Sequence, residues 1–212
     1  MFYTFIASDG SAVRKGDSSK NWYCSAGYAK KILDDKGEVV LEDSKVVEMP
    51  DGSTINQAEL TGLEMAIDSI GTLLEGDNRK DNTVIIAIDS KYTQKSVTSW
   101  FDGWKRTMKD GVAHTRNGTD VKNFDLITKV HDKLVAAKGV QLYRVNSHID
   151  PADYHFAYHE FCAENRVDMP ESAWLIMVGL NDTIDKMVTS TTDKMRQTDF
   201  KKITEGGNFH GL

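Results

Sequence analysis

Three carboxylates stand where a hard metal ion could bind. Asp9 and Asp89 each follow a short apolar segment typical of a β-strand, and Glu59 lies in a helical segment between them. If the two strands are parallel neighbours, both aspartates lie at the carboxyl edge of the sheet, where α/β proteins place their ligands. Carboxylate oxygens from different elements suit Mg²⁺. A fourth acid would allow a second ion, and such a pair can catalyse phosphodiester hydrolysis.

Neither aspartate is decisive by itself. The chain has 32 Asp and Glu residues, and an Asp beside a Gly, as in Asp9-Gly10, is more often a solvated turn former than a metal ligand. The order of the acids along the predicted elements is what favours a metal site.

The elements that would position these acids follow from hydrophobic periodicity and turn residues. Thr54 and Gln57 predict a capping box at the start of a long helix. The strands are expected at 3–8, which would end in a turn at Asp9-Gly10-Ser11, and at 22–33, 38–48, 83–88 and 140–145; the helices are expected at 54–74, 91–100 and 121–138. This order predicts an α/β fold with a five-stranded mixed sheet, three antiparallel strands followed by parallel strands, flanked by helices.

Composition limits the alternatives. With 212 residues and 40% hydrophobic residues, the chain can bury one core, so we expect a catalytic domain at 1–168 and a helical C-terminal extension at 169–212. The net charge of −6 argues against a non-specific nucleic-acid coat protein but not against an enzyme with an acidic centre. Two cysteines, no basic-then-apolar leader and no long apolar run predict a cytoplasmic protein without a membrane span.

Six short segments occur in series between Tyr3 and Asp168. They are Phe5 to Ser11 with its DGS, Asn56 to Leu60 (N-x-x-E-L), Ile88 to Tyr92 (D-S-x-Y), Trp100 and Trp104 with Lys105-Arg106, Val121 to Leu126 (V-K-N-x-D-L), and Val145 to His148. Together they resemble the motifs of the type 1 ribonucleases H, and a series is far more specific than one motif. The resemblance implies a ribonuclease H-like fold and a monomeric endonuclease that cuts the RNA strand of RNA–DNA hybrids, giving 5′-phosphate and 3′-hydroxyl ends.

The resemblance also implies residue roles. Asp9, Glu59, Asp89 and Asp168 would hold two Mg²⁺ ions, with Mn²⁺ as the alternative, and His148 would shuttle protons or ease product release. Trp100 is expected to pack inward. The residues expected to contact the hybrid are Gly10, Ser11, Asn56, Gln57, Ser90, Tyr92, Trp104, Lys105, Arg106, Lys122 and Asn123. A protein partner, if there is one, would use the C-terminal extension.

The fourth carboxylate departs from the family pattern. The family places it about ten residues after the histidine, whereas the segment Glu164-Asn165-Arg166-Val167-Asp168, similar to the family's N-E-R-x-D, ends twenty residues after His148. Asp168 is chosen, with Asp150, Asp153 and Glu164 as competitors. Because Pro170 is tolerated only in a first helical turn, Asp168 should open the last helix.

Two other interpretations stay open. The same scaffold could serve a nuclease that acts on DNA, or a hybrid-binding module that has lost its fourth ligand. His155 and His159, followed by Glu160 and Glu164, are spaced as in a helical zinc site. No pattern supplies a third ligand, so ordinary surface histidines are the preferred interpretation.

Overall fold

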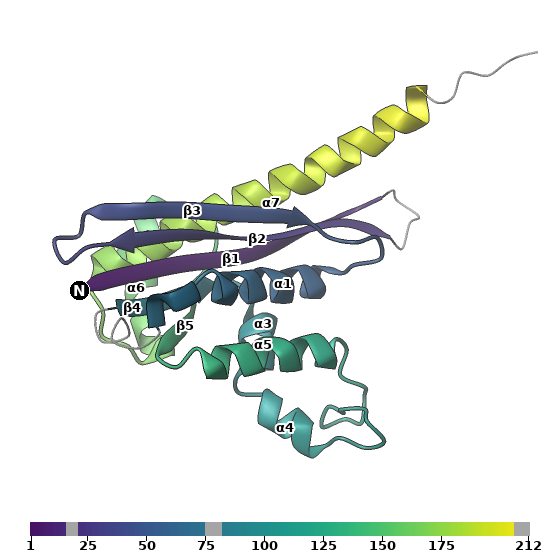
Figure 1. Ribbon diagram of the computed structural model, residues 1–212, viewed down its shortest axis with the longest axis horizontal. Helices are drawn as coiled ribbons and strands as arrows, with labels where there is room; N and C mark the ends of the chain where they lie inside the picture. The colour runs from purple at the N-terminus through teal and green to yellow at the C-terminus, as the bar shows by residue number, and fades with distance from the viewer. Residues whose placement is uncertain (16–20, 75–81, 206–212) are drawn as a thin grey trace, which may run out of the picture.

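The computed structural model describes residues 1–15, 21–74 and 82–205, which form one sheet with helices on both faces (Figure 1). The sheet has five strands in the order β3-β2-β1-β4-β5. β2 is antiparallel to β1 and β3, whereas β4 is parallel to β1 and β5. The bounds are β1 (Phe2–Arg14), β2 (Trp22–Leu33), β3 (Val39–Glu48), β4 (Asn82–Ile88) and β5 (Val140–Arg144). The predicted mixed α/β sheet is confirmed.

The helices divide between the two faces of the sheet. α1 (Ile55–Asp68), α3 (Lys91–Val97) and α5 (Phe124–Ala136) pack against the side of β1 and β4 that carries Ile6 and Ile86. α6 (Tyr154–Asn165) and α7 (Glu171–Glu205) cover the side that carries Phe5 and Ile85. The remaining elements are the short helix α4 (Phe101–Arg106) and the 3-10 turns η1 (Gly71–Leu74) and η2 (Pro151–Asp153). Alternation along β1 and β4 thus builds a core on each face.

The turn predicted at Asp9-Gly10-Ser11 is wrong, because β1 continues through it to Arg14. Residues 9–14 pair one for one with β2, from Asp9 opposite Gly27 to Arg14 opposite Trp22. The partner strand is equally long, so the hydrogen-bonded ladder outweighs the local turn preference of Asp-Gly. Asp9 is therefore held inside a rigid strand.

All three predicted helices are shorter than expected, and the one predicted at 121–138 spans only Phe124–Ala136. α1 starts at the predicted capping box, where Gln57 N donates to Thr54 Oγ1, but it ends at Asp68 instead of running to 74. Gly71 follows with φ 55°, a backbone conformation that favours glycine and cannot continue the helix. The helix predicted at 91–100 ends at Val97, because Thr98 leaves helical geometry (φ −124°, ψ −98°), and α4 begins three residues later.

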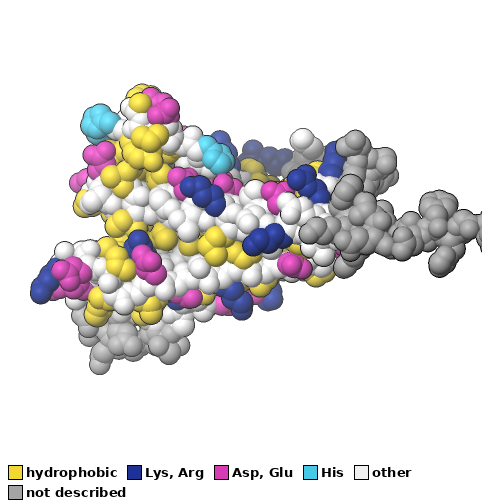
Figure 2. Space-filling model, turned by 90° about the horizontal axis from the view of Figure 1, so that it is seen from above, with side chains coloured by type: hydrophobic (Ala, Val, Ile, Leu, Met, Phe, Trp, Pro, Cys, Tyr) yellow, Lys and Arg dark blue, Asp and Glu magenta, His cyan; other side chains and the backbone are white. Residues whose placement is uncertain are grey.

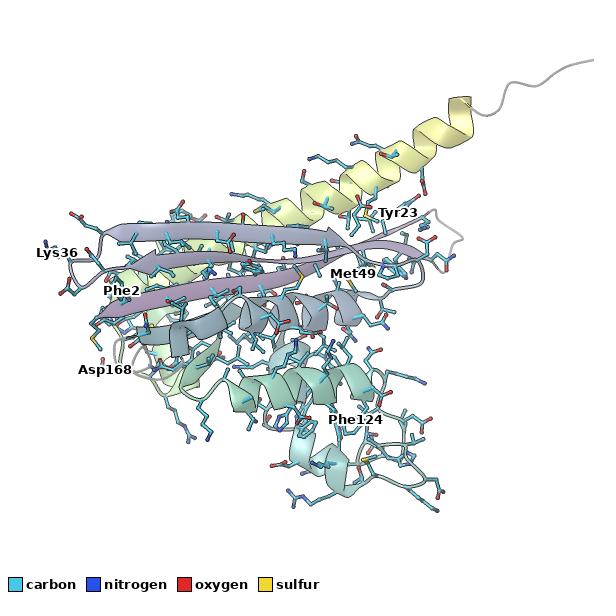
Figure 3. The ribbon with its side chains drawn as sticks, viewed as in Figure 1. Phe2, Tyr23, Lys36, Met49, Phe124 and Asp168 are labelled. Carbon is cyan, nitrogen blue, oxygen red and sulfur yellow. The ribbon has the colours of Figure 1, made fainter. Side chains whose placement is uncertain are left out.

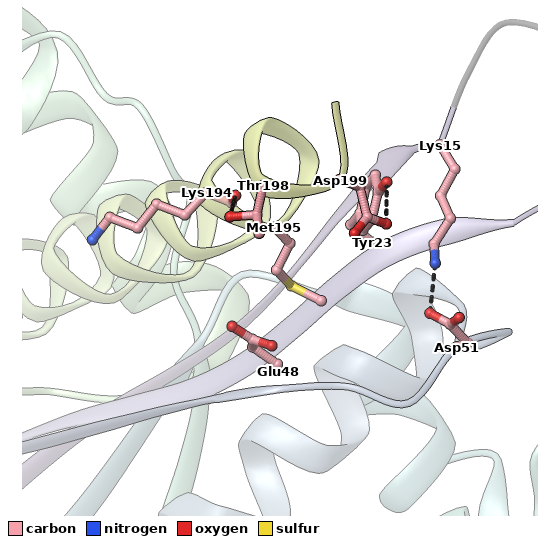
Figure 4. A pocket seen from close by; sticks show the side chains of 8 residues that line it. All are labelled: Lys15, Tyr23, Glu48, Asp51, Lys194, Met195, Thr198 and Asp199. Carbon is pink, nitrogen blue, oxygen red and sulfur yellow. Dashed lines mark hydrogen bonds and ion pairs between the residues drawn. The ribbon is translucent and has the colours of Figure 1, made fainter. Parts of the chain in front are cut away.

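α7 is a helix of 35 residues that crosses the sheet over β1 and β2 and extends beyond it (Figure 1). The Ser25 hydroxyl donates to the Val188 carbonyl (2.7 Å), and near the far end Tyr23 OH donates to Asp199 (2.8 Å; Figure 4). Acidic and basic side chains are interspersed over this side of the molecule (Figure 2). Of the predicted extension, residues 206–212 lie outside the described residues. None of the described helices combines the length and the apolar character of a membrane span.

Candidate metal centre

Asp9, Glu59 and Asp89 meet at one point of the fold. Asp9 comes from β1, Glu59 from α1, and Asp89 directly follows β4. Each offers a carboxylate oxygen, and the three oxygens lie within 4.8 Å of one another. β1 and β4 are adjacent parallel strands in the register Ala7 opposite Ala87, which places Asp9, inside β1, beside Asp89 at the carboxyl end of β4.

Two glycines allow α1 to lie close enough to β1 for Glu59 to reach Asp9. A Cβ on Gly10 would stand 2.4 Å from the Glu59 backbone nitrogen, and one on Gly62 would stand 2.6 Å from the Asp9 carbonyl oxygen. Real Cβ atoms do not approach backbone this closely, so any side chain at either position would push the helix away from the strand. Gly10, expected to contact substrate, is buried under α1 and has a packing role here.

The cluster carries uncompensated negative charge. Burial, together with the nearby charges of Asp89 and Asp185, raises the pKa of Asp9 from 3.8 to about 7, although the Gly10 N–H acts to lower it. Burial and the two aspartates raise the pKa of Glu59 from 4.5 to about 9. Like charges held in a partly dry site disfavour ionisation. Such a site gains stability when a divalent cation replaces the protons.

Asp89 is held by the segment after β5. Burial raises the pKa of its carboxyl group, and Asp185 adds to this rise, although a hydrogen bond with the Ser147 side chain acts to lower it. Arg144 Nε donates to the Asp89 carbonyl (3.1 Å). The neighbouring His148 is exposed, with φ 55° in the left-handed region. This segment therefore brings an accessible imidazole next to a residue that contacts the cluster.

Asp168, predicted as the fourth ligand, lies elsewhere. It is exposed at the opposite end of the sheet, beside Phe2 (Figure 3), and lines an apolar groove of about 340 Å³ with Tyr3 and Thr83 at the starts of β1 and β4. It does not open the last helix either, since α7 starts at Glu171. The long α6 inserted after His148 carries the chain away from the metal cluster.

The three competitors for the fourth position do not join the cluster either. Asp150 accepts from Ala152 N (2.9 Å) at the start of η2, and Asp153 precedes α6. Glu164 lies 3.7 Å from Arg144. Within the described residues, the only group of three or more potential ligands is the Asp9, Glu59 and Asp89 cluster.

The fourth acid near the cluster is Asp185 of α7, which sequence reasoning missed. Its charge raises the pKa of both Asp9 and Asp89. The preceding residue, Ile184, is buried against Gly27, the strand partner of Asp9. A signal was present: Asn181-Asp182-Thr183-Ile184-Asp185 repeats the Asn and Asp spacing of N-E-R-x-D, but it comes 37 residues after His148.

The residues predicted to contact substrate fall into two groups in the structure. Several hold local structure at element ends: Gln57 caps α1, the Ser90 hydroxyl accepts from Thr93 N at the start of α3 (3.2 Å), and Asn123 precedes α5 with φ 60°. Ser11 Oγ lies 3.1 Å from Thr192 Oγ1 of α7. Asn56 is half-buried in the first turn of α1, and Lys122 is exposed before α5.

The second group lies on or beside α4, and two of its members, Tyr92 and Trp104, line a groove of about 670 Å³ there. Tyr92, Trp100 and Trp104 form successive ring contacts, with centroids 6.3 and 5.4 Å apart. The inward packing expected for Trp100 is wrong: this residue is 38% exposed and lines the groove. It directly precedes α4, which projects from the body of the fold (Figure 1). Lys105 and Arg106 are exposed on the same helix. Aromatic faces beside cations suit the sugars and phosphates of a nucleic-acid strand.

The raised pKa values predict how stability depends on pH without metal. In the folded protein, the Asp9 carboxyl group keeps its proton up to about pH 7. In the unfolded chain, it loses the proton at about pH 3.8. Its contribution to stability is therefore fully present below pH 3.8 and is lost as the pH rises towards 7. In EDTA, the melting temperature of the wild type should fall between pH 5 and pH 8 relative to that of Asp9→Asn. Parallel pH profiles of the two proteins would contradict the raised pKa.

The fold and the acidic cluster define an α/β protein with three carboxylates that could hold a metal ion beside the carboxyl end of β4. A family model described as RNase H matches residues 3–157, and the chain belongs to this family. A ribonuclease H of Schizosaccharomyces pombe is 27% identical over 146 residues, covering 68% of this chain and 46% of that protein. The chain spans half or less of the length of the curated relatives it matches.

Solved structures share the fold. A foamy viral protease-reverse transcriptase, determined in complex with dsDNA, matches 73% of this chain and 88% of the compared chain, with a TM-score of 0.51 and 19% identity. The foamy viral protein determined in complex with an RNA/DNA hybrid matches 73% of this chain and 19% of that chain, with a TM-score of 0.50 and 17% identity. At 19% and 17% identity, this likeness shows the shared fold alone.

Proposed function

We propose that this chain is a ribonuclease H that hydrolyses the RNA strand of RNA–DNA hybrids and leaves 5′-phosphate and 3′-hydroxyl ends. The observation that carries the proposal is the convergence of Asp9, Glu59 and Asp89 to within 4.8 Å in a chain of the RNase H family. The hybrid-bound foamy viral structure, which has the same fold, supports a hybrid as the substrate.

The donor set fits Mg²⁺, or Mn²⁺ as the alternative. Three carboxylate oxygens from separate rigid elements are hard ligands, and they leave room for water and phosphate oxygens in the coordination shell. Divalent ions bound there, two in our proposal, would supply Lewis-acid stabilisation of charge at the scissile phosphate. Asp185 takes the place of Asp168 as the fourth acid in this proposal, because its charge acts on both Asp9 and Asp89.

The surrounding residues would orient the substrate and move protons. Ser147 keeps the Asp89 carboxylate in place through its hydrogen bond. The exposed imidazole of His148 would accept or deliver a proton at the leaving oxygen or during product release. The aromatic groove with Lys105 and Arg106 would hold the DNA strand, and this hold should weaken with salt.

Cleavage of an end-labelled RNA–DNA hybrid, beside RNA and DNA duplexes, with Mg²⁺ or EDTA, tests the proposal. Asp185→Asn should lower the cleavage rate about 10 to 100-fold, because it removes a charge that acts on two ligands. Asp168→Asn, its matched control at the far end of the sheet, should cleave like the wild type.

The alternatives give different results in the same assay. Loss of cleavage in Asp168→Asn with full activity in Asp185→Asn would reverse the assignment of the fourth acid. Equal cutting of DNA duplex would indicate a nuclease that acts on DNA. A folded wild type that binds the hybrid and does not cut it with Mg²⁺ or Mn²⁺ would leave a binding module.

A further inference from the structure

A second group of metal-binding side chains lies on α6, separate from the acidic cluster. His155 and His159 are one helical turn apart and both are exposed. Their Nε2 atoms are 3.2 Å apart and their rings are perpendicular, with centroids 4.5 Å apart. We propose that these two imidazoles bind one borderline transition-metal ion, Zn²⁺, Ni²⁺ or Cu²⁺, through both Nε2 atoms.

The distance between the two nitrogens fits a shared ion. With metal–nitrogen bonds of about 2.0–2.1 Å, nitrogens 3.2 Å apart subtend an angle of about 103° at the metal, close to tetrahedral. In the metal-free pair one Nε2 must donate its hydrogen to the other, so an acceptor lone pair already points between the rings. If the proton of the donor ring moves from Nε2 to Nδ1, the lone pair of that Nε2 also becomes free to bind the ion. The chelate therefore needs a change of tautomer and little movement of the backbone.

The chemistry of the pair separates it from the acidic cluster. Neutral imidazole suits Zn²⁺, Ni²⁺ and Cu²⁺ and is a poor ligand for Mg²⁺, whereas the three carboxylates prefer the harder ions. The two sites can therefore be filled by different metals in the same solution. Since both histidines are exposed, water can complete the coordination shell.

Among the described residues, the two histidines belong to no group of three or more potential metal ligands. Glu164, which the sequence suggested, lies 3.7 Å from Arg144. Cys162 is one turn beyond His159 and half-buried, where it packs against the core and hydrogen-bonds to Tyr158. The proposed site therefore has two protein ligands, and water would take the remaining coordination positions.

Binding should stabilise the start of α6. An ion held by residues one turn apart links the first two turns of a helix that follows the His148 segment through η2. An ion that binds only this folded geometry raises the stability of the native state with its concentration. Zn²⁺ should therefore raise the melting temperature of the wild type, even when Mg²⁺ is present in excess.

Calorimetric titration with Zn²⁺ in excess Mg²⁺, which keeps the acidic cluster filled, tests the site. The wild type should bind one ion that His155→Ala and His159→Ala each bind at least about 10-fold more weakly, since each variant lacks one of two ligands. Glu160→Ala and Cys162→Ser are the matched controls on the same helix and should bind like the wild type. All four variants should cleave hybrid at the wild-type rate with Mg²⁺ alone.

A spectroscopic readout keeps the test independent of stability. With one equivalent of Cu²⁺, the electron paramagnetic resonance spectrum should show two imidazole nitrogens in the wild type and one in either single His variant. Equal Zn²⁺ affinity in the wild type and both His variants would overturn the proposal. Loss of Zn²⁺ binding in a folded Cys162→Ser variant would show that Cys162 is also a ligand, and would overturn a site made of the two histidines alone.

Discussion

Asp9→Asn should abolish metal-dependent cleavage while making the metal-free protein more stable at pH 8. Asp9 is 4% exposed, and it faces Glu59 and Asp89 within 4.8 Å. Removing its charge takes away a metal ligand worth several kcal/mol of transition-state stabilisation, so the rate should fall about 10³-fold or more. The same change removes repulsion inside the cluster, which should raise the melting temperature in EDTA.

Two measurements on the same variant separate these effects. Hybrid cleavage at saturating Mg²⁺ reports the lost ligand, and thermal melting in EDTA at pH 8 reports the lost repulsion. Asp51→Asn is a useful control, because Asp51 is an exposed acid outside the cluster that pairs with Lys15, the residue after β1 (Figure 4). Substantial Mg²⁺-dependent cleavage by Asp9→Asn would show that the reaction does not depend on this cluster.

Gly62→Ala should impair both folding and activity through one added methyl group. In an isolated helix this change is favourable by about 1 kcal/mol. In α1, however, the new Cβ would stand 2.6 Å from the Asp9 carbonyl oxygen and 3.1 Å from that of Gly27. Because both neighbours are backbone, the helix must shift, which should cost about 1–3 kcal/mol of folding free energy. A shift of this kind moves Glu59 away from Asp9, and cleavage should fall about 10²-fold.

Gly179→Ala provides the matched control. Gly179 is an exposed helical glycine of α7, and a Cβ there meets no atom within 4 Å. This variant should gain up to about 1 kcal/mol in chemical denaturation and keep its cleavage rate. If Gly62→Ala behaved like Gly179→Ala in both measurements, the close packing of α1 on β1 would not be needed for the site.

Local patterns were enough to predict most elements and the three converging acids. Alternation in the strands, helical spacing from Leu60 onwards and the Thr54–Gln57 capping box act over a few residues, so they can be recognised in the sequence. The parallel pairing of β1 and β4 then brings Asp9 and Asp89 side by side. These features depend on short-range chemistry and on a general rule of α/β sheets.

Packing between residues far apart in the sequence determined the features that local patterns did not predict. The Asp9-Gly10-Ser11 segment has turn chemistry, and only its pairing with β2 keeps it in a strand. The fourth acid depends on the path of α7, which is determined by the burial of Ile184 on Gly27 and by the hydrogen bond from Ser25 to Val188. These contacts join residues more than 150 positions apart, so sequence spacing favoured Asp168, whereas the helix crossing brings Asp185 near the cluster.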